Sequence, residues 1–199
     1  MKLIILGAGY ATRLYPLTLS EPKSLLSVAG KPMIEHVMNN LAPIKYIDHV
    51  YIVSNNKFVN HFQQWANSYM IGHSGVGITI INDYSTDDTN KLGAIGDLYL
   101  MLTQEQINDD IIVVAGDNLF SKRLDEFGEF CHKKNAPVLA VYDVGSLEEI
   151  KKYHAIELSN NGLITFFEEK PTVPKSTLTG IALYYYPQPS LGLIQQWVS

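Results

Sequence analysis

Residues 1–23 read MKLIILGAGYATRLYPLTLSEPK, and this segment is the most informative one for predicting the fold of the chain. Residues 2–6 (KLIIL) are mostly leucine and isoleucine, which predicts a short buried strand. The strand ends at once in the small residues Gly-Ala-Gly at 7–9, which let backbone N–H groups approach and hold a phosphate. Arg13 and Lys23 add two cations where a triphosphate would lie. The guanidinium of Arg13 is planar and can donate two hydrogen bonds side by side, whereas the ammonium of Lys23 is a compact charge on a flexible chain.

The Gly-x-Gly turn alone is ambiguous, because it also fits dinucleotide-binding folds and plain tight turns. Dinucleotide binding needs a third glycine, where Thr12 stands, and an acidic residue at the end of the second strand. That strand is predicted over 49–53, and Ser54, Asn55 and Asn56 follow it. A dinucleotide-binding oxidoreductase therefore stays an alternative that both positions disfavour.

The segment from Leu6 to Thr18 (LGAGYATRLYPLT), followed by Pro22-Lys23, resembles the signature of the sugar-phosphate nucleotidyltransferases. Its Leu-Tyr-Pro-Leu-Thr spelling is most similar to that of the glucose-1-phosphate thymidylyltransferases. Ala11 departs from the pattern, because the family usually has glycine there and alanine leaves the backbone less free. The resemblance implies that Arg13 and Lys23 are catalytic and that the nucleotide is bound by Leu6, Gly7, Ala8, Gly9, Thr12 and Gly93.

Composition limits the classes of protein that the chain can belong to. With 199 residues, 46% of them hydrophobic, it can bury one sizeable core, so we expect one domain over 1–199. The net charge of −5 and the lack of a basic block argue against a nucleic-acid partner. The single cysteine, Cys131, excludes an intramolecular disulfide and a cysteine-based zinc cluster. No apolar run approaches a membrane span, and Lys2 leads directly into the first strand, so we expect no membrane partner and no signal peptide. A cytoplasmic location is the resulting expectation.

Strands and helices are predicted to alternate along the chain, which indicates an α/β fold with a mostly parallel sheet. The resemblance makes this a Rossmann-like three-layer α/β/α sandwich. One antiparallel hairpin is predicted around Asn161-Gly162, and Pro32 is expected at the first position of a helix. Further strands are expected over 77–81, 111–115, 138–142 and 178–186, and helices over 33–41, 58–66, 92–102 and 120–131, Cys131 lying on the buried stripe of the last of these.

Residues 82–91 (NDYSTDDTNK) are polar, and two interpretations stay open for them. They form either a solvated connection or a loop that lies over the nucleotide base. The following segment, from Gly93 to Leu98, aligns with the family's Gly-Thr-Ala-Gly-Ala-Leu, in which small residues allow the base and ribose to come close. Asp97 stands in place of the second alanine, and the simplest interpretation is a side chain that faces solvent.

The apolar run 111–115 (IIVVA) predicts a central strand buried on both faces, and Gly116-Asp117-Asn118 follows it. A carboxylate at the carboxyl end of such a strand lies where open α/β sheets bind ligands. Mg²⁺ favours oxygen ligands and needs only one or two protein carboxylates beside substrate phosphates and water. A turn with no other role is the alternative. The resemblance implies that Asp117 binds Mg²⁺ and that Asn118 contacts substrate.

Residues 168–171 (EEKP) follow the predicted hairpin and are either a solvated strand end or a binding motif. In the family this motif holds the sugar phosphate, which implies that Glu169 accepts hydrogen bonds from sugar hydroxyls and that Lys170 meets the phosphate. Gly180 is likewise implied to face the sugar. His154 stands where thymidylyl-type relatives often have glycine, which leaves the identity of the sugar open.

We therefore expect transfer of a nucleotidyl group from a nucleoside triphosphate to a sugar 1-phosphate, with Mg²⁺ as cofactor. Two alternatives are a cytidylyltransferase for a phosphorylated amino alcohol and a non-catalytic nucleotide-binding regulatory domain. Family members carry a second metal-binding aspartate in a later Asp-x-Gly stretch, which this sequence lacks, so the C-terminal part of the family pattern is expected to be missing. The sequence does not determine the base, the sugar or the oligomeric state.

Overall fold

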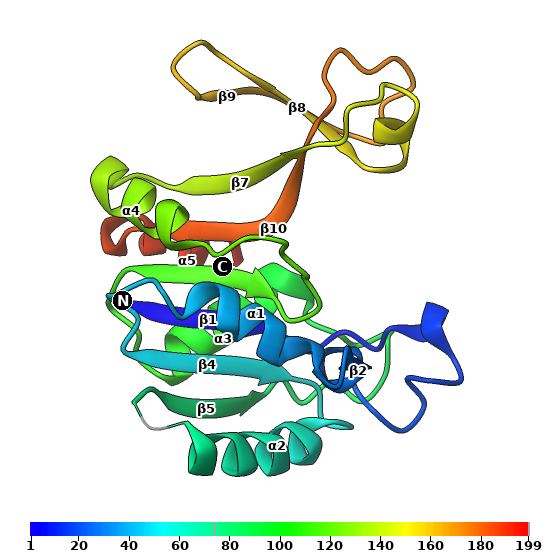
Figure 1. Ribbon diagram of the computed structural model, residues 1–199, viewed down its shortest axis with the longest axis vertical. Helices are drawn as coiled ribbons and strands as arrows, with labels where there is room; N and C mark the ends of the chain where they lie inside the picture. Colours follow the sequence, from blue (N-terminus) through cyan, green and yellow to red (C-terminus); the bar gives the residue numbers. More distant parts are fainter. Residues whose placement is uncertain (74, 199) are drawn as a thin grey trace. The chain divides into compact units, whose positions relative to one another are not determined.

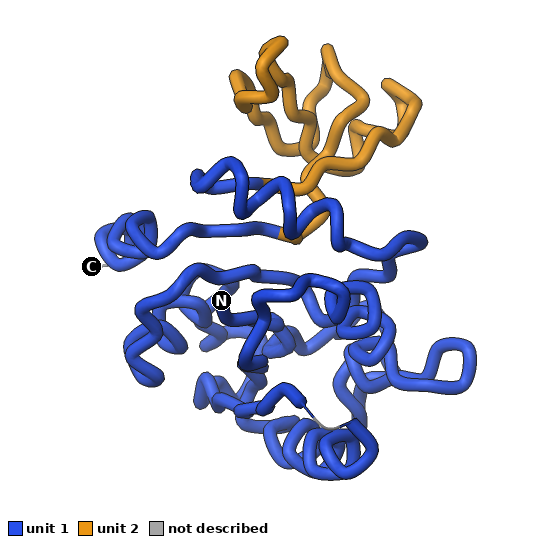
Figure 2. The backbone as a smooth tube through the Cα atoms, turned by 60° about the vertical axis from the view of Figure 1, so that its left-hand side comes forward, with its two compact units in different colours: residues 1–138, 184–199 blue, residues 139–183 orange. Residues whose placement is uncertain are grey.

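A computed structural model describes residues 1–73 and 75–198 of the chain (Figure 1). The backbone divides into two compact units, one formed by Met1–Val138 with Tyr184–Ser199 and the other by Leu139–Leu183 (Figure 2). Compactness does not by itself decide which part of a chain folds alone. The single domain over 1–199 therefore stays a prediction.

The first unit is built on parallel strands in the order β5-β4-β1-β6, followed by the end of β10. Each pairing that β1 makes, with β4 and with β6, is parallel, and so is that of β4 with β5. The carboxyl ends of these strands therefore lie along one edge of the sheet. The strands are β1 (Lys2–Leu6), β4 (His49–Ser54), β5 (Gly77–Asn82) and β6 (Ile111–Ala115).

Helices cover both faces of this sheet. Leu3 and Ile4 point to opposite faces because side chains alternate along a strand. Ile4 belongs to a buried cluster with residues of α3 (Gly93–Gln104) and α5 (Leu191–Val198). Leu3 instead lies with Leu41 of α1 (Met33–Leu41) around a cavity on the other face. The predicted α/β sandwich with a mostly parallel sheet is confirmed (Figure 1).

Three predicted element boundaries in this unit were wrong. Pro32 caps α1 rather than starting it, because residues 27–32 form a two-stranded hairpin before the helix. The helix predicted over 58–66 runs to Gly72, and the one predicted from Phe120 begins five residues later. The remaining elements of the unit are η1 (Thr12–Leu14), η2 (Lys23–Leu25), β2 (Ser27–Val28), β3 (Lys31–Pro32), α2 (Val59–Gly72), α4 (Asp125–Lys134) and η4 (Gln188–Ser190).

The second unit contains the predicted hairpin. Its two strands pair antiparallel, with His154 opposite Glu169. Gly162 has φ +81°, the left-handed conformation that a tight turn requires and that glycine adopts without strain. The elements of this unit are most of β7 (Val138–Asp143), η3 (Glu149–Lys152), β8 (His154–Leu158), β9 (Ile164–Glu169) and the greater part of β10 (Leu178–Tyr186), which neighbours β7 in the strand order.

Candidate functional site

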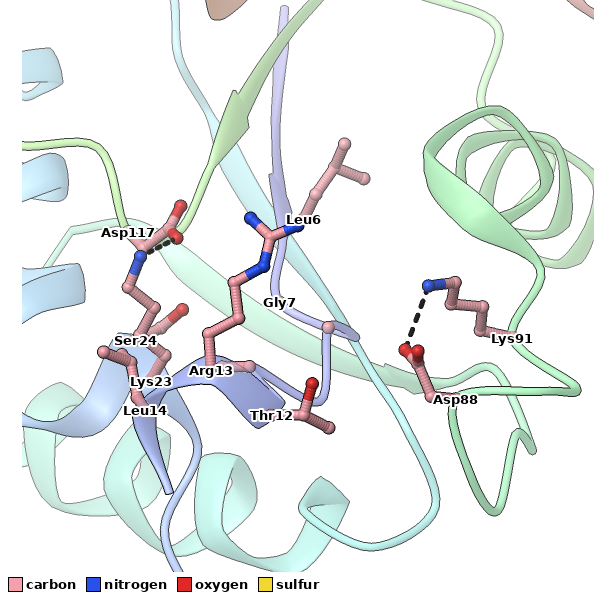
Figure 3. A pocket seen from close by; sticks show the side chains of 12 residues that line it. Leu6, Gly7, Thr12, Arg13, Leu14, Lys23, Ser24, Asp88, Lys91 and Asp117 are labelled. Atoms are coloured by element: carbon pink, nitrogen blue, oxygen red, sulfur yellow. Dashed lines mark hydrogen bonds and ion pairs between the residues drawn. The ribbon is translucent and has the colours of Figure 1, made fainter. Parts of the chain in front are cut away.

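The first unit has a cavity of about 530 Å³ at the carboxyl ends of β1 and β6 (Figure 3). These strands are neighbours in the sheet, so the loops that follow them meet at one place. The cavity brings together seven of the residues predicted to bind nucleotide, to catalyse or to bind metal. It is lined by Leu6, Gly7, Gly9, Ala11, Thr12, Arg13, Leu14, Lys23, Ser24, Asp88, Lys91 and Asp117.

The glycine-rich loop after β1 is fixed by close backbone contacts. The Gly7 N–H donates to the Val53 carbonyl at 2.9 Å. A Cβ on Gly7 would lie only 3.0 Å from that carbonyl oxygen and from the Phe62 ring, so a larger residue does not fit without movement. At Gly9, by contrast, a Cβ would meet no atom within 4 Å. The loop is therefore packed at its first glycine and open to a ligand at its second.

Ala11 adopts the left-handed conformation, with φ 48° and ψ 41°, directly before η1. A non-glycine residue pays roughly 1–2 kcal/mol for this conformation. The Ala11 carbonyl accepts a hydrogen bond from the Thr18 hydroxyl at 2.8 Å, and Thr18 is fully buried. This contact explains why the sequence places a threonine after Pro-Leu: it holds the strained loop in place.

Lys23 and Asp117 form an ion pair in the cavity, with Nζ 2.6 Å from Oδ2 (Figure 3). Both side chains are about one-third exposed, so the pair remains open to a ligand. Gly116 makes this approach possible, because a Cβ there would lie 2.7 Å from the Ser24 Oγ next to Lys23. The residues expected to be catalytic and metal-binding are therefore in contact before any substrate arrives.

Arg13 lies in the cavity without an ion pair among the described residues, whereas Lys91 pairs with Asp88 at 2.9 Å. Figure 3 shows the Arg13 guanidinium between the Lys23–Asp117 pair and the Lys91–Asp88 pair. Three cationic and two anionic side chains thus line the cavity, an arrangement suited to an anionic ligand. Of the two interpretations of residues 82–91, the cavity favours the loop beside the ligand, since Asp88 and Lys91 belong to its lining.

Sequence reasoning missed Asn55, which is fully buried after β4. Its Nδ2 donates to the Ala8 carbonyl at 2.9 Å, and its Oδ1 accepts from the Phe58 N–H at 3.1 Å. Ala8 is itself buried and contributes through this backbone contact rather than by lining the cavity. The position of Asn55 at the carboxyl end of a strand was the signal that could have identified it.

The interpretation of Asp97 as a solvent-facing side chain was wrong. Asp97 is 6% exposed, and its Oδ1 has no hydrogen-bond partner. Burial, together with the nearby Asp83 carboxylate, raises the pKa of Asp97 to about 7. The helical spacing explains the error, because Asp97 lies four residues before the buried Met101 and shares its face of α3.

Gly93 and Asn118 lie beside the cavity rather than in its lining. Gly93 begins α3 with φ +74°, two residues after Lys91. Asn118 follows Asp117 directly, and its N–H donates to the Ala115 carbonyl at 3.2 Å. Their roles toward nucleotide and substrate stay predictions.

Glu169, Lys170 and Gly180 lie in the second unit. Lys170 has φ 47° and donates its N–H to the Tyr153 carbonyl at 2.7 Å, and its side chain is exposed. The Gly180 N–H donates to the His154 Nε2 at 3.1 Å. A sugar bound through this N–H would have to displace the His154 ring. The predicted sugar contacts of these residues stay predictions.

Asp117 is the residue of the cavity that fits a Mg²⁺ site. Its carboxylate is a hard oxygen donor just after the carboxyl end of β6, and Mg²⁺ commonly binds one or two such carboxylates together with substrate phosphates. No group of three histidine, cysteine or acidic side chains that could hold a metal occurs within residues 1–73 and 75–198. A magnesium ion here would therefore depend on the phosphates of a bound nucleotide. The same described residues include no helix that is both long and apolar enough to cross a membrane.

Comparison with known proteins places these features in context. A family model described as nucleotidyl transferase matches residues 2–196. A candidate mannose-1-phosphate guanyltransferase of Sulfolobus acidocaldarius is 30% identical over 96% of this chain and 50% of its own length. The UTP–glucose-1-phosphate uridylyltransferase of Haloferax volcanii is 28% identical over 94% of this chain and 72% of its own length. The bifunctional protein GlmU of Methanocaldococcus jannaschii is 25% identical over 98% of this chain and 42% of its own length. The chain therefore spans about half the length of two of these relatives.

Solved structures share the fold. A candidate glucose-1-phosphate thymidylyltransferase of Bacillus anthracis superposes with a TM-score of 0.80 at 25% identity, covering 98% of this chain and 75% of that one. A UDP-glucose pyrophosphorylase in complex with UDP-glucose superposes with a TM-score of 0.77 at 19% identity, covering 98% of this chain and 79% of that one.

Proposed function

The chain belongs to the nucleotidyl transferase family, and we propose that it transfers a nucleotidyl group from a nucleoside triphosphate to a sugar 1-phosphate. A phosphate oxygen of the acceptor attacks the α-phosphorus, the bond from that phosphorus to the bridging oxygen breaks, and pyrophosphate leaves. The attacking oxygen is already ionised at neutral pH, so no general base is needed. The work left to the protein is alignment and charge stabilisation.

The observation that carries this proposal is the set of cations facing one another in the cavity beside the glycine-rich loop. Arg13 makes no ion pair among the described residues, so its donors are available for the β- and γ-phosphates and for the charge that develops on pyrophosphate. Lys23 lies 2.6 Å from Asp117, and we assign it to the α-phosphate side of the ligand. Lys91 supplies a third cation on the opposite wall.

Asp117 would hold Mg²⁺ once a triphosphate is bound, and the ion would there neutralise phosphate charge. With Asp117 holding the ion, the ammonium of Lys23 would be available to a phosphate oxygen. The pair seen in the structure thus keeps both charged groups compensated until the ligand replaces each partner.

The acceptor is proposed to use the second unit. Lys170 is 68% exposed and Glu169 is 76% exposed, and their charged atoms lie 3.8 Å apart. A sugar phosphate offers a dianion for the lysine and hydroxyl donors for the glutamate, which matches this pair of groups. The left-handed backbone at Lys170 is a conformation that non-glycine residues rarely adopt and that concentrates at functional sites.

The base is proposed to be a pyrimidine, of thymidylyl or uridylyl type. The Leu-Tyr-Pro-Leu-Thr segment over 14–18 supports this assignment, as do the names of the uridylyltransferase relative and the thymidylyltransferase structure. The guanyltransferase relative shows that a purine is the competing outcome.

A substrate panel tests the function. Five nucleoside triphosphates are each combined with several sugar 1-phosphates and with a phosphorylated amino alcohol, and pyrophosphate release is measured in the presence of Mg²⁺. Release with TTP or UTP and a sugar 1-phosphate supports the proposal. Release only with CTP and a phosphorylated amino alcohol would instead indicate a cytidylyltransferase. Triphosphate binding without release in any combination would indicate a regulatory nucleotide-binding domain.

A further inference from the structure

A buried polar network lies behind the nucleotide cavity, where the loops after β1 and β5 meet α3. Its members are between 2% and 6% exposed. The Ser85 N–H and hydroxyl both donate to the Asp83 carboxylate, at 2.7 and 2.8 Å. Tyr10, from the glycine-rich loop, lies with its hydroxyl 3.4 Å from the Ser85 Oγ. Because the single hydroxyl proton of Ser85 is given to Asp83, Tyr10 is the donor in this last contact.

Asp97, the fifth residue of α3, completes the network. The Asp83 carboxyl lies nearby, and both side chains are buried. Neither carboxyl makes an ion pair within the part of the chain that the structure describes, and one oxygen of Asp97 has no partner. Two buried carboxylates in contact cannot both stay ionised without a compensating cation, so such pairs hold one proton between them.

The proton belongs mainly to Asp97. Asp83 already accepts hydrogen bonds from the Ser85 N–H and hydroxyl, so its oxygens serve as acceptors in this network. A protonated Asp97 can donate to Asp83, and its unpartnered oxygen is then the carbonyl of a neutral acid rather than half of a charge. Burial raises the pKa of Asp97 to about 7, in keeping with this assignment.

We propose that Asp97 is a positioning residue, whose proton fastens α3 to the loop that forms one wall of the nucleotide cavity. That loop begins at Asp83 and carries Asp88 and Lys91, both of which line the cavity. Loss of the proton places two like charges in contact inside the protein, which drives the loop and α3 apart. The wall that carries Lys91 then loses its position, and nucleotide affinity falls.

Other titratable groups near α3 do not account for such a change between pH 6 and 8.5. The elements packed on α3 include β1, β4 and α5, and the buried cluster that α3 joins also contains residues of β5, β6 and the end of β10. No titratable side chain occurs in α5, and Lys2 and His49 lie at the amino ends of β1 and β4. The remaining groups are the tyrosines Tyr10, Tyr51, Tyr99, Tyr184 and Tyr186, and burial raises the pKa of Tyr10, Tyr184 and Tyr186.

Hydrogen exchange tests the fastening without any nucleotide. Amide protection of peptides covering residues 82–98 is compared between the wild type and Asp97→Asn at pH 6 and pH 8.5. The asparagine amide donates to Asp83 and does not titrate, and the ratio of the two proteins cancels the intrinsic pH dependence of exchange. Equal protection at pH 6 and lower protection of the wild type at pH 8.5 are expected. If the two proteins show the same relative amide protection at pH 6 and at pH 8.5, the proposal is overturned.

The effect on the ligand, which rests on the proposed function, is measured separately. The Kd of Mg²⁺-UTP is determined for both proteins, and their ratio cancels the ionisation of UTP itself. The ratio should be close to 1 at pH 6 and reach up to about 30 at pH 8.5, as expected if only the protonated state binds. A constant ratio overturns the positioning role. Absence of UTP binding to either protein at both pH values counts against the proposed function, while hydrogen exchange still decides the shared proton.

Two further results keep the test decisive. If Asp97→Asn does not fold, Asp83→Asn removes the same like-charge contact and should give the same loss of pH dependence. Protection of residues 82–98 that follows added Mg²⁺ or K⁺ rather than pH would assign the pair to a bound cation, and would overturn the shared proton.

Discussion

The Asp97→Asn substitution has a consequence for stability whose size follows from proton linkage. In the unfolded chain the Asp97 carboxyl has the ordinary pKa of 3.8, and in the folded protein its pKa is raised to about 7. The folded protein therefore holds this proton more tightly than the unfolded chain does. The wild type loses stability as the pH rises from about 4 to about 7, and the loss is complete above the folded pKa. Asparagine cannot titrate, so the variant lacks this loss.

The size of this stability loss can be calculated for the interval from pH 5 to pH 8, in which unfolding is measured. At pH 5 the unfolded carboxyl is already ionised while the folded one is still protonated. Each further pH unit up to about 7 costs the wild type about 1.4 kcal/mol. The free energy of unfolding of Asp97→Asn, relative to the wild type, should therefore rise by on the order of 2.5 kcal/mol between pH 5 and pH 8.

The assay is urea denaturation of both proteins at pH 5, 6, 7 and 8. The quantity followed across pH is the difference in the free energy of unfolding between Asp97→Asn and the wild type. The cost of exchanging a hydroxyl for an amide does not depend on pH, so it does not contribute to the change in this difference. Glu129→Gln is the matched control, because Glu129 is exposed and makes no ion pair within the described residues. The difference in the free energy of unfolding between Glu129→Gln and the wild type should be the same at all four pH values. Unfolding curves for Asp97→Asn that run parallel to the wild type across this range would refute a raised pKa at Asp97.

Four other substitutions follow from the cavity and from the second unit. Arg13→Ala should lower turnover by about 10²-fold or more in a folded protein, the usual scale for losing one charge-stabilising donor, as measured by pyrophosphate release. Asp117→Asn should remove the Mg²⁺ dependence of triphosphate binding in calorimetry, and an unchanged dependence would exclude Asp117 as the ligand. Lys170→Ala should weaken sugar-phosphate binding while triphosphate affinity stays within about twofold, and equal losses for both ligands would contradict the division of roles. Gly116→Ala should cost about 1–3 kcal/mol of stability by overpacking, because its Cβ would lie 2.7 Å from the Ser24 Oγ.

The part of the site that the sequence predicted rests on strand order. β1 and β6 are continuous apolar runs, and such runs form the buried centre of a parallel sheet. Their carboxyl ends are adjacent, so the loop with Arg13 and the turn with Asp117 had to meet. Lys23 reaches the same place because η2 follows the loop closely. These contacts could be anticipated because they depend on topology rather than on details of packing.

The residues that were missed depend on contacts that a sequence pattern does not specify. Thr18 and Asn55 hold backbone carbonyls of the glycine-rich loop, and which carbonyl a polar side chain reaches depends on the loop conformation. Lys91 lies in a polar segment whose composition also fits a solvated connection. Asp97 was taken for a surface residue because aspartate is rarely buried without a partner. Its partner, Asp83, is 14 residues away and is itself an acid, which no simple pairing rule would select.

The central claim is that this chain joins a nucleotide to a sugar phosphate, and phosphorus NMR of the reaction mixture tests it most directly. The wild type and Arg13→Ala are incubated with Mg²⁺, a sugar 1-phosphate and the triphosphate that binds most tightly. The wild type should form a nucleotide-sugar diphosphate and pyrophosphate in equal amounts, and Arg13→Ala should form both about 10²-fold more slowly. Orthophosphate and a nucleoside diphosphate as the products would show hydrolysis instead of transfer, and would contradict the account.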